Sequence, residues 1–250
     1  MRSRASARHW PRLWLPASVI RGLSDQGAKQ ATSTIPIVIV AAEDPVGAGL
    51  AASLARPGGN VTGLSSQGSD TMMKNFSLLA EILPEASHFG VLMDPDNPLH
   101  AQVFDSFKRE AAQRHLRLQQ ALKRSAEDIA PAFASMAANG VQAVFVLPDC
   151  VAIDNRLRIA ELAVKYRIPS AHMLRGEAVV GGLLAYGPDI ADLFRRAAGY
   201  VAKLLQGAKA AELPIEQAER FQLVINLKTA KALGLTISPS LLARADEVIE

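Results

Sequence analysis

From residue 31 onward, short blocks rich in valine and isoleucine alternate with segments of helical periodicity. The apolar blocks lie at 35–40, 61–64, 88–93, 116–121, 142–147, 169–172, 183–186 and 221–225. Strands that alternate with amphipathic helices form parallel sheets flanked by helices. The sequence therefore predicts an α/β protein, in which a ligand would bind beyond the carboxyl ends of the strands.

The first apolar block is followed by Gly47-x-Gly49-x-x-Ala52, the glycine spacing of a dinucleotide-binding loop. In such a loop the first glycine follows the strand at once, so that amides at the helix start meet the pyrophosphate. Here Asp44 is a good N-cap and Pro45 a good first helical residue, which places both glycines inside a helix. We therefore interpret the glycines as letting that helix approach the sheet. Asp44 is a candidate contact for a cationic group such as an ammonium.

Charge and cysteine content exclude several functions. The chain has 250 residues and a formal net charge of +3, but residues 1–30 alone contribute +5. The remaining residues therefore sum to −2 and offer no basic face for nucleic acid. Cys150 is the only cysteine, which excludes an internal disulfide and a thiolate metal cluster.

The first thirty residues show no sustained period. Pro11, Arg12 and Pro16 interrupt the apolar run that a secretory signal would need. No window reaches the roughly 18 consecutive apolar residues of a membrane span. We expect residues 1–30 to be poorly ordered and the chain as written to lack an export signal.

Several long segments carry a family resemblance: ATSTIPIVIV, DPVGAGLAASLARPGGNVTGLS, GGLLAYGP and the run that starts at FRRAAGYVAKLLQG and ends at the last residue. They are similar to the substrate-binding proteins of ABC transporters, of the type related to tryptophan and tyrosine binders. The resemblance covers residues 28–250 in the order and spacing of the family.

The resemblance implies a type I periplasmic binding protein, with two flavodoxin-like lobes of parallel sheet joined by three crossing strands. The first lobe would comprise residues 31–64 and 185–212, and the second 65–184 and 213–250. Residues 1–30 do not resemble the family, so we expect an incomplete first lobe and a truncated or shifted reading frame. The family's compartment is the periplasm, whereas a chain without an export signal would stay in the cytoplasm.

Five residues that follow strands or crossings form the candidate ligand-binding set: Asp44, Ser65, Asn97, Asp149 and Tyr186. In the relatives, an acid after the strand at 142–147 helps to hold the amino group of an amino-acid ligand, and Asp149 matches it. The next residue is an asparagine in some relatives and Cys150 here. Acids and asparagines at such positions are also good helix caps, above all Asn97 before Pro98. Tyr186 is one of the few aromatic residues that could stack on an indole or phenol.

The sequence offers no complete catalytic set. Its five histidines lack metal-ligand spacing, no Gly-x-Ser-x-Gly elbow occurs, and Cys150 has no second cysteine to work with. We therefore predict a non-enzymatic protein without a cofactor. An effector-binding regulator is one alternative, although no helix-turn-helix segment is present. A small-molecule enzyme of flavodoxin-like architecture is the second alternative.

The leading hypothesis is capture of a small molecule, an amino acid or a related compound, by closure of a hinge between the two lobes. The resemblance supplies the partner, an ABC permease in the membrane. The sequence leaves the oligomeric state and the identity of the ligand open.

Overall fold

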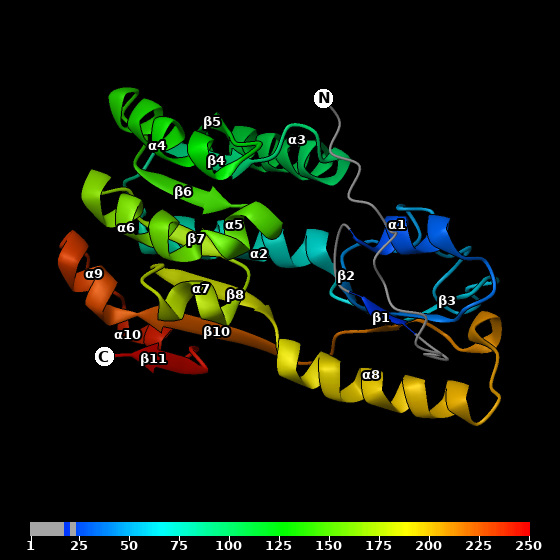
Figure 1. Ribbon diagram of the computed structural model, residues 1–250. Coiled ribbons are helices and arrows are strands. Elements are labelled where there is room, and N and C mark those ends of the chain that lie inside the picture. Colours follow the sequence, from blue (N-terminus) through cyan, green and yellow to red (C-terminus); the bar gives the residue numbers. More distant parts are fainter. Residues whose placement is uncertain (1–17, 21–23) are drawn as a thin grey trace. The chain divides into compact units, whose positions relative to one another are not determined.

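The computed structural model describes residues 18–20 and 24–250 (Figure 1). The chain divides into two compact units. The first takes the chain up to Gln67 together with Ile190–Ala218, and the second comprises Gly68–Asp189 and Glu219–Glu250. The chain thus passes between the units three times, at positions three to six residues from the predicted boundaries.

The second unit contains a seven-stranded sheet in the order β11-β10-β8-β7-β6-β4-β5. Its strands are β4 (His88–Met93), β5 (Arg117–Leu122), β6 (Ala143–Val146), β7 (Ser170–His172), β8 (Leu184–Pro188), β10 (Phe221–Asn226) and β11 (Glu247–Ile249). Every neighbouring pair is parallel except β8 and β10, which are antiparallel. The predicted α/β class with parallel sheets is therefore confirmed.

Helices connect these strands: α2 (Gly68–Ile82), α3 (Pro98–Gln113), α4 (Ile129–Ala138), α5 (Cys150–Asp154), α6 (Arg156–Tyr166), α7 (Arg175–Val179), α9 (Leu227–Leu233) and α10 (Pro239–Leu242). A 3-10 turn, η2 (Ala126–Asp128), precedes α4. Residues on β6 alternate between two cores, because successive side chains of a strand point to opposite faces of the sheet. Phe145 packs with Phe76 and Phe107 from α2 and α3. Val144 packs in the core that α4 and α6 supply. Burial on both faces explains the near-continuous apolar blocks of the sequence.

The first unit contains a four-stranded parallel sheet in the order β1-β2-β3-β9. Its elements are β1 (Ser18–Ile20), α1 (Ser24–Ala31), β2 (Ile37–Ala42), β3 (Val61–Ser65), α8 (Ile190–Leu205), the 3-10 turn η3 (Ala210–Glu212) and β9 (Glu216–Gln217). Ile37, Ile39, Val61 and Ile215 pack together in this unit. Val38 and Val40 on β2 and Leu193 on α8 are buried as well. Across residues 18–20 and 24–250, none of the helices combines the length and apolar character that crossing a bilayer requires.

The expectation that residues 1–30 lack regular structure is wrong for part of that range. Residues 18–20 form β1, which pairs in parallel with β2, and α1 begins at Ser24. The rest of the range lies outside the described residues. Three residues are too few to show a periodic pattern, and β1 owes its hydrogen bonds to a strand about twenty residues further on.

The predicted helix after Pro45 is also wrong. Residues 45–49 form hydrogen-bonded turns, in which Asp44 Oδ1 accepts the Gly47 N–H at 2.8 Å as an N-cap would. Gly49 then adopts a left-handed conformation with φ of +68°. The Lys29 ammonium donates to the Gly49 carbonyl and, at 3.0 Å, to the Leu50 carbonyl. These two carbonyl groups therefore do not accept the hydrogen bonds of a continuing helix. The glycines therefore serve a tight turn and not the approach of a helix to the sheet.

Candidate functional site

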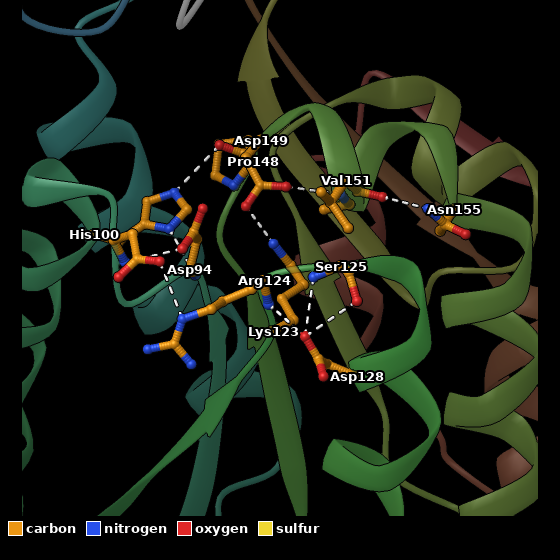
Figure 2. A network of polar contacts seen from close by, with 12 residues as sticks. Asp94, His100, Lys123, Arg124, Ser125, Asp128, Pro148, Asp149, Val151 and Asn155 are labelled. Carbon is orange, nitrogen blue, oxygen red and sulfur yellow. Dashed lines mark hydrogen bonds and ion pairs between the residues drawn. The ribbon is translucent and has the colours of Figure 1, made fainter. Parts of the chain in front are cut away.

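The carboxyl ends of three neighbouring strands carry a cluster of polar side chains in the second unit. Asp94 follows β4, Lys123 follows β5, and Asp149 follows β6. These strands are adjacent in the order β6-β4-β5 and are parallel, so their ends share one edge of the sheet. Figure 2 shows the resulting network, in which residues from the three loops contact one another. This edge is where an α/β sheet binds its ligand.

A buried ion pair joins the ends of β5 and β6. The Lys123 ammonium contacts Asp149 Oδ2, and the two side chains are 0% and 2% exposed. The other carboxylate oxygen of Asp149, Oδ1, accepts the Ala152 N–H at 2.7 Å and so caps α5. Both carboxylate oxygens of Asp149 are therefore engaged by groups of the protein (Figure 2).

His100 joins the ends of β4 and β6. Its Nδ1 accepts the Asp94 backbone N–H at 3.0 Å, so Nε2 carries the proton and donates to the Pro148 carbonyl at 3.3 Å. Burial lowers the pKa of His100 below its ordinary value, an effect that outweighs the opposing attraction of the Asp149 carboxylate. His100 is consequently a neutral side chain that links two loops.

The outer part of the network is exposed. Arg124 Nε lies 3.0 Å from Asp96 Oδ2, and both side chains are mostly exposed. Asp128 Oδ2 accepts the Arg124 and Ser125 backbone N–H groups at 2.8 and 3.0 Å. These backbone hydrogen bonds lower the pKa of Asp128. Exposed ion pairs contribute little to stability, so this rim leaves the Arg124 and Asp96 side chains free to rearrange around a ligand.

Two further predicted residues lie in the second unit. Asn97 caps α3, because its Oδ1 accepts the Leu99 N–H at 3.0 Å. Tyr186, on β8, stacks on Phe221 with ring centroids 5.8 Å apart. The buried Asn75 amide bonds both backbone groups of Tyr186, taking its N–H at 3.1 Å and donating to its carbonyl. Burial and, to a lesser extent, the Asp246 carboxylate raise the pKa of Tyr186.

The remaining two predicted residues lie in the first unit. Asp44 is exposed and caps the turn after β2. Ser65 is buried at the end of β3, where its hydroxyl accepts the Gln67 N–H at 3.4 Å. The structure thus brings Asn97 and Asp149 to one sheet edge, puts Tyr186 on a strand of the same unit, and assigns Asp44 and Ser65 to the other unit.

Lys123 is absent from the predicted set, although it is fully buried at the same edge. A single lysine after a strand gives the signal of a solvated surface charge. Only its place two residues after the apolar block at 116–121, together with an acid after the next buried strand, would have suggested pairing. The described residues contain no group of three or more histidine, cysteine, aspartate or glutamate side chains that could hold a metal ion.

Comparisons with known proteins agree with this architecture. The chain is 27% identical over 212 residues to a tyrosine-binding protein of Clostridioides difficile, covering 85% of this chain and 61% of that protein. It therefore spans less than two thirds of the length of this curated relative.

Two crystal structures are similar in both sequence and fold. A conserved domain protein from Vibrio cholerae has a TM-score of 0.84 and 29% identity, covering 93% of this chain and 77% of that one. An ABC domain from Streptococcus pneumoniae, in complex with L-Trp, has a TM-score of 0.82 and 27% identity, with 93% and 78% covered. The type I periplasmic binding protein fold expected from the sequence is thereby confirmed.

The model of the family described as ABC transporter substrate binding protein matches residues 18–249. The match includes residues 18–30, so the expectation that this stretch is unrelated to the family is wrong. The family is one of substrate-binding proteins, and one of the similar structures holds L-Trp. The chain belongs to the family of ABC transporter substrate binding proteins.

Proposed function

We propose that this chain captures a small solute, an amino acid or a related compound, and delivers it to an ABC permease. The observation that carries the proposal is the family match over residues 18–249. The polar loops at the carboxyl edge of the second unit add a site where such a solute would bind. The periplasm is the compartment in which the proposed capture takes place.

The proposed mechanism is closure of the two units around the solute. Three passages of the chain between the units supply the hinge. A solute drives closure only by binding the closed form more tightly than the open one, by several kcal/mol if the switch is to be nearly complete. No step of this mechanism makes or breaks a covalent bond, and we propose that the chain is not an enzyme.

An aromatic amino acid is the ligand to test first. One similar structure is a complex with L-Trp, and one relative is a tyrosine-binding protein. The candidate contacts are Asp44 and Ser65 in the first unit and Tyr186 in the second. Asn97 and Asp149 contribute by shaping their loops, because their acceptor oxygens already serve helix caps.

Thermal-shift and calorimetric titration of the chain against the amino acids tests the proposal. A cognate amino acid at a hundredfold excess over its Kd stabilises by about 2.7 kcal/mol. For a chain of this size, that corresponds to a rise in Tm of roughly 5–10 °C. If no amino acid raises the Tm, the ligand class is wrong.

A pair of matched variants then tests the site. Asp44→Asn removes an exposed charge from the proposed site and is expected to weaken binding about tenfold, or about 1.4 kcal/mol. Asp105→Asn removes another exposed charge, paired with Lys108 on α3, and should leave the affinity unchanged. Equal effects of the two variants would rule out Asp44 as a contact.

A further inference from the structure

The Asp149 carboxylate is bound by groups of the protein itself, without any solute. Lys123 contacts one oxygen, and the first turn of α5 holds the other through the Ala152 N–H at 2.7 Å. The neighbouring Pro148 carbonyl accepts the Nε2–H of the buried His100 at 3.3 Å. The loop after β6 is therefore held at two consecutive residues, Pro148 by His100 of α3 and Asp149 by Lys123 after β5 (Figure 2).

Because the Asp149 side chain is only 2% exposed and contacts Lys123, a ligand ammonium would have to take the place of the Lys123 ammonium. The Lys123 side chain is 0% exposed, so this exchange would move one ammonium group into water and bury another. Burying a charge costs several kcal/mol, and a buried pair offsets this cost only when its geometry is good. The exchange replaces one such pair by another and yields no net attraction for the solute.

We propose that Lys123 is a positioning residue that reserves the Asp149 carboxylate for the protein, so that a bound solute is not held by an ammonium–Asp149 contact. This inference rests on the proposed function and specifies how one half of its site is built. The loops after β4, β5 and β6 form a preorganised edge in which Lys123, Asp149 and His100 fix the backbone. An amino group of the solute is recognised by other residues.

Asp149→Asn separates the two roles of the acid. Asparagine keeps the oxygen that caps α5 and removes the charge that pairs with Lys123. The probes are L-tryptophan and indole-3-propionate, which share the ring system and the carboxylate and differ in the ammonium group. The quantity compared is the Kd of indole-3-propionate divided by the Kd of L-tryptophan. A positioning role predicts that the variant weakens binding of both probes by the same factor, so that this ratio stays within twofold of its wild-type value. A fall of this ratio by tenfold or more would show that Asp149 holds the ammonium, and would overturn the proposal.

Stability measurements test the pair without any ligand. Lys123→Met and Asp149→Asn are each expected to lower the Tm by roughly 8–15 °C, because each leaves a buried group without its partner. The double variant should recover most of this loss, because it leaves no unpaired charge. Additive losses in the double variant would overturn the proposal. Asp96→Asn, at the exposed Arg124 pair of the same edge, is the matched control and should leave the Tm within about 2 °C.

The two experiments fail in different ways. If the wild-type chain binds neither probe, the aromatic ligand class of the proposed function is wrong, and the Tm comparison still decides whether Lys123 and Asp149 act as a pair. If the chain binds L-tryptophan and the ratio of the two Kd values falls tenfold or more in Asp149→Asn, the proposed function is supported and the positioning role of Lys123 is wrong.

Discussion

At the scale of single residues, His100 gives the second unit a defined pH response. Its neutral ring accepts the Asp94 N–H through Nδ1, and a proton on this nitrogen would remove that bond. Burial lowers the pKa of His100 in the folded chain, so between that value and the unfolded pKa of about 6.5 the unfolded chain binds more protons. The stabilising effect of a neutral His100 is complete above pH ~6.5 and is lost as the pH falls toward the folded pKa.

Urea unfolding of the wild type and of His100→Gln between pH 7.5 and 5.0 measures this effect. The variant removes one titrating group, so its free energy of unfolding should fall less steeply with decreasing pH. The difference in slope is at most about 1.4 kcal/mol per pH unit. Burial and Arg117 also lower the pKa of His88, so a smaller dependence persists in the variant. Parallel pH profiles would contradict this role of His100, and His115→Gln, on an exposed side chain, is the control.

The residue scale also shows what the sequence could not reveal about the site. Asp149 was recognisable because it follows a buried strand, and its second function as a helix cap could be foreseen from its residue type. Its partner could not be foreseen. Lys123 lies twenty-six residues earlier, and its burial depends on the order β6-β4-β5, which no local pattern contains.

At the scale of elements, the central strands were the most predictable part of the fold. The apolar blocks at 88–93 and 221–225 coincide with β4 and β10 to within one residue. Burial on both faces leaves such strands few polar positions, so they stand out in the sequence. The helix predicted after Asp44 is wrong although Asp44 does act as a cap. The chain makes one turn after Asp44 and then leaves the helical path. Two glycines within five residues weaken a helix by about 1 kcal/mol each, and here they decide against it.

The pairing of β2 with β3 depends on a close approach at Gly63. This residue has φ of +132°, and a Cβ added to it would lie 2.2 Å from the Ile39 carbonyl oxygen. Gly63→Ala is therefore expected to cost about 3 kcal/mol or more, since both the backbone conformation and the clash with main-chain atoms are unfavourable.

Chemical denaturation and hydrogen exchange of Gly63→Ala check this expectation. Amides of β2 and β3 should lose protection, whereas those of β4 and β6 in the other unit keep it. Gly59→Ala, where an added Cβ meets nothing within 4 Å, should change the free energy of unfolding by less than about 1 kcal/mol. Equal losses in the two variants would show that the approach of β3 to β2 is not the cause.

At the scale of the whole molecule, the two units are unequal. The described sheet of the first unit has four strands, whereas that of the second unit has seven strands and a core on each face. Stability rises with the apolar surface that a unit buries. Unfolding without ligand should therefore occur in two steps, with the first unit opening at lower denaturant concentration. Native-state exchange should show lower opening free energies for β2 and β3 than for β4 and β6.

A solute bound by both units changes this behaviour in a way that tests the capture mechanism. Such a solute loses its site when either unit opens, so it stabilises both against unfolding by the same linkage term, about 2.7 kcal/mol at a hundredfold excess over Kd. The two transitions should then move together, and the opening free energies of β2 and β4 should both rise. A solute held by the second unit alone would protect β4 and β6 and leave β2 and β3 unchanged. That outcome would place the whole site on the edge formed by Asp94, Lys123 and Asp149, and hinge closure would no longer be needed to explain binding.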